Sequence, residues 1–256
     1  MKQSLAHELV AEFFGTMLFM TFGCGSVAMV KLFGAGVPGE VVNGGFTNVV
    51  LGWGLGVMLG VYLAGGISGA HLNPAVTLAL AAFRGFSWRK VIPYSIAQTA
   101  GAFFAAALVF WNYLPAFHKV DPGLAVTGGI FTTFPAFPGQ PMVGLLDQVI
   151  GTALLLIAVF AVTDDRNLAP SPTLQPVLIG LIVVLIGISF GGLQGYAINP
   201  ARDLGPRLFI TLAGFKYNGL IDGTGVFWVP IVGPLLGGPL GAFAYEFGIR
   251  RYLPKR

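Results

Sequence analysis

Long apolar runs separated by short polar stretches dominate the hydrophobicity pattern of this chain. Six runs are long enough to cross the hydrocarbon core of a bilayer, which is about 30 Å thick and takes about 20 helical residues. They lie near residues 8–30, 43–66, 90–111, 147–163, 174–192 and 228–250. Because backbone polar groups in lipid must be satisfied within the segment, such runs predict helices. We therefore expect six membrane-spanning helices.

Two further apolar runs, near residues 74–83 and 200–209, are too short to span the membrane, since ten helical residues reach only about 15 Å. Each run begins at an Asn-Pro-Ala box: Asn73, Pro74 and Ala75 in the first, and Asn199, Pro200 and Ala201 in the second. Asn before a Pro at the first helical position is a helix start signal. The pattern predicts two re-entrant half-helices whose N-termini meet near the midplane. Irregular backbone at that depth is tolerated only inside protein or along a water-filled cavity.

The two halves of the chain resemble each other. The segment EFFGT at 12–16 corresponds to QVIGT at 148–152, and GAHLNPAVT at 69–77 corresponds to GYAINPARD at 195–203. A repeat of three spans, an odd number, must enter the membrane from the opposite side in its second copy. We expect one channel domain over 1–256, with repeat one at about 1–112, a linker at about 113–146 and repeat two at about 147–256. The predicted fold is an all-α membrane protein in which six transmembrane helices and two re-entrant half-helices form an inverted three-span repeat around a central pore.

Composition and charge agree with this interpretation. Hydrophobic residues make up 55% of the 256 positions and charged residues 9%, against roughly 25% charged residues in soluble domains. Under the six-span interpretation nine basic residues share one side of the membrane, against three on the other (Lys31, Lys119 and Lys216). The nine are Lys2, Arg84, Arg89, Lys90, Arg166, Arg250, Arg251, Lys255 and Arg256. The positive-inside rule then places both termini in the cytoplasm.

The Asn side chains give the midplane a defined chemistry. An Asn cap accepts a backbone N–H through its side-chain oxygen, which leaves its amide NH2 free. Two such amides, from Asn73 and Asn199, and two helix N-termini, each equivalent to roughly half a positive charge, would face the pore. This arrangement favours the oxygen of a neutral solute and disfavours a cation or a proton.

The Asn-Pro-Ala boxes, the repeat and the six spans resemble the aquaporin superfamily, along essentially the whole chain. The resemblance implies a homotetramer with one pore per subunit, passive flow, and an extracellular constriction formed by Arg202 with residues of the second and fifth spans. It also implies the glycerol-conducting branch, of which Asp203 directly after the second box is typical. The constriction would comprise Trp53, Gly187, Tyr196 and Arg202. By this resemblance, Trp53 and an aromatic ring at Tyr196 match glycerol channels, and Gly187 stands where water-selective members have a narrowing His.

Three polar residues are expected to support the pore wall. Glu12 lies inside the first span, where an ionisable group is costly and has a partner. We expect it to accept hydrogen bonds from the backbone or from His71 in the first re-entrant loop. Its repeat mate is Gln148, where the family more often has Glu, and this residue can still form hydrogen bonds.

The expected function is a passive channel for glycerol and similar small neutral solutes, with water, urea and other small polyols as further candidates. A water-selective channel is the first alternative. An ion-coupled transporter is a remote one, because no cluster of titratable groups resembles a proton relay. His7, His71 and His118 are scattered, so neither a metal site nor an enzyme is expected. No cofactor and no nucleic-acid partner are indicated, and the short termini favour a bacterial inner membrane.

Overall fold

The computed structural model describes residues 4–34, 43–168 and 170–254, and the regular structure within these ranges is entirely helical. Six helices are long and apolar enough to cross a membrane, as the hydrophobicity pattern predicted. They are α1 (Leu5–Leu32), α2 (Gly45–Ser68), α4 (Trp88–Asn112), α6 (Pro141–Thr163), α7 (Gln175–Gln194) and α9 (Val229–Gly248). Short 3-10 turns, η2 (Val226–Trp228) and η3 (Arg250–Tyr252), flank α9.

The fourth long helix begins earlier than the apolar run indicated. Helix α6 starts at Pro141, a residue suited to the first helical position. Asp147 and Gln148 interrupt the apolar pattern, yet both are buried within the helix. The expected linker therefore contains the first turns of α6, together with α5 (Leu114–Val120) and η1 (Gly128–Ile130).

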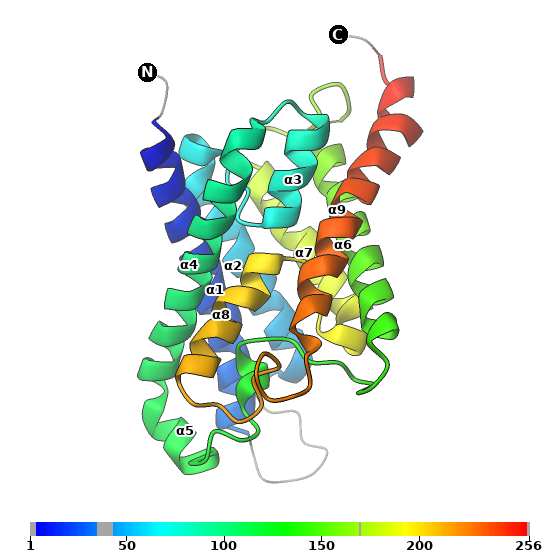
Figure 1. Ribbon diagram of the computed structural model, residues 1–256. Coiled ribbons are helices and arrows are strands. Elements are labelled where there is room, and N and C mark those ends of the chain that lie inside the picture. The colour runs from blue at the N-terminus through cyan, green and yellow to red at the C-terminus, as the bar shows by residue number, and fades with distance from the viewer. Residues whose placement is uncertain (1–3, 35–42, 169, 255–256) are drawn as a thin grey trace.

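Two half-helices meet near the middle of the bundle. They are α3 (Pro74–Phe83) and α8 (Pro200–Leu212), and each starts at the Pro of an Asn-Pro-Ala box. Figure 1 shows α3 entering from the end where both chain ends lie and α8 entering from the end where α5 lies. The re-entrant arrangement expected from the sequence is thus confirmed, although α8 is longer than its apolar run.

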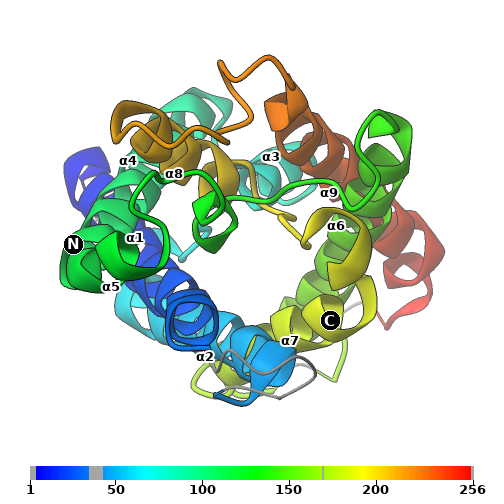
Figure 2. The ribbon, with the colours of Figure 1, turned by 90° about the horizontal axis from the view of Figure 1, so that it is seen from below.

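The long helices surround a central axis, which Figure 2 views from the α5 end. Packing follows the repeat: α1 contacts α2 and α4, and α6 contacts α7 and α9. The half-helices are exchanged between repeats, since α3 of the first packs on α9 of the second and α8 packs on α4. Neither half of the chain is therefore complete without the other.

Glycines bring paired helices into close contact at equivalent places in the two repeats. A Cβ added at Gly101 in α4 would overlap the carbonyl oxygen of Phe13 in α1. A Cβ at Gly237 in α9 would overlap the carbonyl oxygen of Val149 in α6 in the same way. Small residues allow such close approach of backbones in membrane proteins, where packing contacts largely drive helix association.

An ionic cluster ties α3 to α6 and α9 at the end of the bundle that holds both chain ends. Arg84 contacts Glu246 at 2.6 Å and Asp164 at 3.4 Å, and Arg250 contacts Asp164 at 2.8 Å. Burial of Asp164 opposes its ionisation, but the Arg166 N–H and the charges of both arginines outweigh burial and lower its pKa. Arg84, Arg250 and the other described basic residues of this end fit the expected charge asymmetry. Lys2, Lys255 and Arg256 lie outside the described residues.

Replacing Gly101 by Val should destabilise the protein by about 1–3 kcal/mol, because α4 would be forced away from α1. The melting temperature of the detergent-solubilised protein, followed by tryptophan fluorescence, measures this. Gly65→Val in α2 is the control, since a Cβ there meets nothing within 4 Å. Equal melting temperatures for the two variants would contradict close packing at Gly101.

Candidate pore and constriction

The two Asn side chains cap the half-helices that meet at the middle of the bundle. Asn73 Oδ1 accepts a hydrogen bond from the Ala75 N–H at 2.8 Å. Asn199 Oδ1 accepts from the N–H groups of Ala201 at 3.0 Å and Arg202 at 3.2 Å. Each half-helix therefore begins with its first N–H groups satisfied by its own Asn, as expected for an N-cap.

The amide nitrogens of these Asn side chains join the two loops to each other. Asn73 Nδ2 donates to the Ile198 carbonyl at 2.9 Å, and Asn199 Nδ2 donates to the Leu72 carbonyl at 2.8 Å. The sequence predicts that both hydrogens of each amide are free, whereas the structure uses one of the two for this reciprocal link. Each amide carries two hydrogens, so one per Asn can still be offered to a solute.

The turns before the boxes adopt a strained backbone conformation. Ala70 and Leu72 have φ angles of 49° and 52°, and Tyr196 and Ile198 have 36° and 44°. The left-handed region costs a residue other than glycine on the order of 1–3 kcal/mol. Surrounding hydrogen bonds must hold these turns in place.

In the first repeat these hydrogen bonds converge on Glu12, which is fully buried in α1. Its two carboxylate oxygens accept four of them, from the Ser68 hydroxyl (2.6 Å), the His71 N–H (2.9 Å), the Leu72 N–H (2.7 Å) and the Gln98 amide (2.7 Å). The His71 ring turns away from Glu12, with its Nδ1 3.1 Å from Thr77 Oγ1. Glu12 thus contacts the backbone of the loop rather than the His71 ring.

In the second repeat the residue equivalent to Glu12 accepts fewer hydrogen bonds. Gln148 Oε1 accepts one hydrogen bond, from the Ile198 N–H at 2.8 Å. Its amide nitrogen donates to Asp147 Oδ2 at 3.0 Å. Asp147 is not among the residues predicted from the sequence, although an ionisable residue inside a span is a signal that could have identified it.

Two cavities lie on either side of a narrow place in the bundle. The inner cavity, of about 90 Å³, is lined by Asn73, Asn199 and their loops. The outer cavity, of about 470 Å³, opens toward the α5 end. The residues that line both cavities are Trp53, Tyr196 and Arg202. These three side chains, which we call the constriction, therefore separate the cavities.

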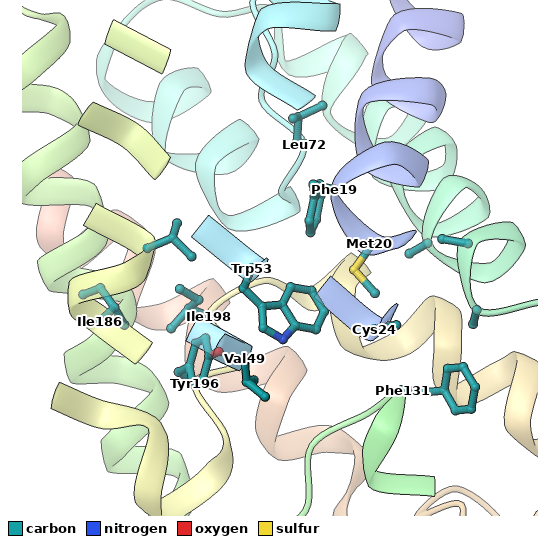
Figure 3. Close-up of a cluster of buried hydrophobic side chains, with 14 of the residues drawn as sticks. Phe19, Met20, Cys24, Val49, Trp53, Leu72, Phe131, Ile186, Tyr196 and Ile198 are labelled. Atoms are coloured by element: carbon teal, nitrogen blue, oxygen red, sulfur yellow. The ribbon is translucent and has the colours of Figure 1, made fainter. Parts of the chain in front are cut away.

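Arg202 lies against the face of Trp53, with its guanidinium carbon 4.0 Å from the ring centre. It also donates a hydrogen bond to the Phe131 carbonyl at 2.9 Å. Figure 3 shows Trp53 with Tyr196 on one side and Cys24 of α1 on the other. The lack of a side chain at Gly23 makes room for the indole, because a Cβ there would overlap its ring.

Gly187 lines neither cavity, although the sequence argument placed it in the constriction itself. A Cβ added there would lie 3.0 Å from Tyr196 Cζ and 2.8 Å from Val50 Cγ1. Gly187 therefore lies behind Tyr196 and determines how far the tyrosine can withdraw. The Tyr196 hydroxyl is buried and has no hydrogen-bond partner within the described ranges.

Asp203 also lies away from both cavities. Its Oδ1 accepts from Arg207 Nε at 2.7 Å, and its Oδ2 accepts from the N–H and the hydroxyl of Thr133, each at 2.8 Å. Both charged side chains of this pair are fully buried. The guanidinium of Arg207 further donates to the carbonyls of Thr133 at 2.7 Å and Asn218 at 2.8 Å.

This buried pair, Asp203 and Arg207, acts on the constriction indirectly. It anchors Thr133, two residues after the Phe131 carbonyl that holds Arg202. A planar guanidinium suits the task, because its donors lie in fixed directions. The partners come from segments about 70 residues apart in sequence, so no local pattern could have indicated them.

The turn that carries Asn218 is shaped by Asp222. The Asp222 carboxylate accepts the N–H groups of Asn218 at 3.0 Å and Gly219 at 2.7 Å. Burial opposes ionisation of Asp222, but these hydrogen bonds and those from Thr224 outweigh burial and lower its pKa. In the described ranges no group of three or more His, Cys, Asp or Glu side chains could hold a metal ion.

Six spans and two opposed half-helices around a cavity define a membrane channel built as an inverted repeat. Residues 1–245 match the family model described as major intrinsic protein. The chain belongs to this family.

Individual relatives extend the comparison. The glycerol uptake facilitator protein of Escherichia coli K12 is 42% identical, over 98% of this chain and 91% of its own length. Aquaporin-10 of the tardigrade Milnesium tardigradum is 41% identical over 98% of this chain, which spans 64% of that longer relative. The X-ray structure of the aquaglyceroporin from Plasmodium falciparum has a TM-score of 0.83 at 30% identity, covering 95% of this chain and 96% of its own.

Replacing Arg207 by Lys should destabilise the protein by about 1.5–3 kcal/mol, because one ammonium cannot replace the three directed hydrogen bonds. Amide exchange in residues 131–134, measured by mass spectrometry, should become faster at the same time. Arg89→Lys is the matched control, since Arg89 is exposed. An Arg207→Lys protein with unchanged melting temperature and exchange would refute the anchoring role.

Proposed function

We propose that this protein is a passive channel for glycerol and similar small neutral solutes, which also passes water and excludes ions and protons. The observation that carries the proposal is the constriction, where two aromatic side chains and one guanidinium separate the two cavities. The similarity of the whole chain to a glycerol uptake facilitator and to an aquaglyceroporin supports the same conclusion.

The constriction matches a polyol on two sides. The rings of Trp53 and Tyr196 offer an apolar surface for the carbon edge of the solute. Arg202 uses one terminal nitrogen for the Phe131 carbonyl, so its remaining donors can bind solute hydroxyls. The absence of a side chain at Gly187 lets the Tyr196 ring lie back against α7. These features favour a glycerol channel over the water-selective alternative.

Positive charge at two depths supports the exclusion of cations. Arg202 stays protonated in proteins, and Lys31 lines the outer cavity beside it. At the midplane the N-termini of α3 and α8 add roughly half a positive charge each. A cation crossing the pore would meet these charges with no carboxylate beside it, because no Asp or Glu of the described residues lines either cavity.

We further propose a homotetramer in the bacterial inner membrane, with one pore per subunit and both termini cytoplasmic. The bacterial glycerol facilitator supports the location, and the clustering of basic residues supports the orientation. A groove of about 670 Å³ bordered by α1, α2 and the end of α4, lined by Phe22, Leu55 and Leu108 among others, offers a surface for a neighbouring subunit. The repeat boundaries at about 1–112 and 147–256, with the linker at 113–146, are part of this proposal.

Liposomes containing the purified protein should shrink rapidly after an osmotic step with sucrose. With glycerol they should shrink and then re-swell quickly, as followed by light scattering. Empty liposomes are the control. Rapid shrinkage in sucrose with re-swelling in glycerol no faster than in empty liposomes would identify a water channel and reject the glycerol proposal.

Gly187→His should reduce glycerol permeability about tenfold, and more than water permeability, because the new side chain pushes Tyr196 and Val50 toward the pore. The same light-scattering measurement gives both rates. Gly65→His in α2 is the matched control, since a Cβ there meets nothing within 4 Å and Gly65 lines neither cavity. Equal losses of glycerol and water flux would show that Gly187 does not influence solute size selection.

A further inference from the structure

We propose that Asp147 is a positioning residue that orients the Gln148 amide and thereby fixes the second re-entrant loop at the constriction. It supplies, from the neighbouring position, the negative charge that Glu12 supplies in the first repeat. The inference rests on the proposed function, because its effect on solutes passes through Tyr196.

The two repeats support their loops with unequal chemistry. Glu12 and Gln148 occupy equivalent places in the repeat, and so do Leu72 and Ile198, which both have left-handed backbones. Glu12 Oε2 accepts the Leu72 N–H, and Gln148 Oε1 accepts the Ile198 N–H. A carboxylate has two acceptor oxygens, whereas an amide has one, so Gln148 can perform this task in only one orientation.

Asp147 selects that orientation. Its Oδ2 accepts the Gln148 amide nitrogen at 3.0 Å, and an ionised carboxylate can only accept. If the amide turned over, its nitrogen would face the Ile198 N–H, donor to donor, and its oxygen would face the carboxylate. Both hydrogen bonds would be lost in a place where Gln148 is fully buried and Asp147 is 4% exposed.

The surroundings of Asp147 indicate no other role. No ion pair in the described part of the chain includes it. It lines neither cavity of the pore. An unpaired carboxylate inside a span is costly and is retained for a specific task.

The loop that Gln148 holds begins next to the same part of α6. Gln194, the last residue of α7, is buried, and a Cβ added at Gly144, about one turn before Gln148 on α6, would overlap its side-chain oxygen. The chain then turns at Gly195, with φ of 69°, and passes Tyr196 before it reaches Ile198. Tyr196 therefore lies two residues before the residue whose N–H Gln148 accepts, so the orientation of the Gln148 amide bears on its position.

A double-variant cycle tests this inference. Asp147→Leu removes the acceptor and should lower glycerol permeability about fivefold while lowering water permeability less. Gln148→Glu alone should also lower it, because two buried carboxylates would then be adjacent. The double variant Asp147→Leu with Gln148→Glu should recover most of the wild-type rate, since Glu needs no fixed orientation. A cycle in which the two losses simply add, or in which Asp147→Leu has no effect, overturns the proposal.

A second, nearly isosteric cycle uses Asp147→Asn in place of Asp147→Leu and applies if the leucine variant fails to fold. A smaller loss is expected, because Asn keeps an acceptor oxygen but its NH2 group can also pair with the reversed Gln148 amide. Gln148→Glu should again restore the rate in the double variant, and additive losses again overturn the proposal. Amide exchange of residues 195–198 gives a readout that does not depend on the solute. If exchange follows the cycle but wild-type liposomes do not conduct glycerol, the proposed function fails alone. If wild-type liposomes conduct glycerol but exchange does not follow the cycle, the role of Asp147 fails alone.

Discussion

Two reciprocal hydrogen bonds at the centre of the bundle constrain everything around them. Asn73 reaches the carbonyl before the second box, and Asn199 reaches the carbonyl before the first. Each Asn also caps its own half-helix, so one side chain fixes a helix start and the opposite loop together. Unsatisfied backbone groups at this depth are costly. The two half-helices can therefore begin here only by facing each other. The six long helices provide the walls for that meeting.

The chemistry that supports this meeting point differs between the two ends of the molecule. At the α3 end, Glu12 gathers four donors around one loop. At the α8 end, two groups of side chains share this role. One is Gln148 with Asp147, and the other is the buried pair of Asp203 and Arg207. The second arrangement holds a loop of the same length, 195–199 against 69–73, and also a separate segment around Phe131. A symmetric backbone is therefore stabilised by asymmetric side chains, and the constriction lies on the side with the more elaborate support.

Much of the fold could be predicted from the sequence, because apolar length and helix start signals are local properties. The six spans and both Asn-Pro-Ala half-helices are of this kind. The start of α6 could not be predicted from the sequence. The polar pair Asp147 and Gln148 separates the short stretch 141–146 from the apolar run that follows, although all of these residues lie in one helix. The residues of the pore could be located from the repeat, but their partners could not. The Ile198 carbonyl that Asn73 reaches and the Thr133 carbonyl that Arg207 reaches both lie far away in sequence and have no periodic signal.

The exchange of half-helices between repeats has a consequence for biosynthesis. Helix α8 packs on α4, which has already been translated when α8 emerges. Helix α3 packs on α9, the last long helix of the chain, so it lacks this partner until translation is almost complete. Domains normally begin to fold from the N-terminus during synthesis. Here the first re-entrant segment can acquire its full set of contacts only at the end, which makes pore closure around it a late step in maturation.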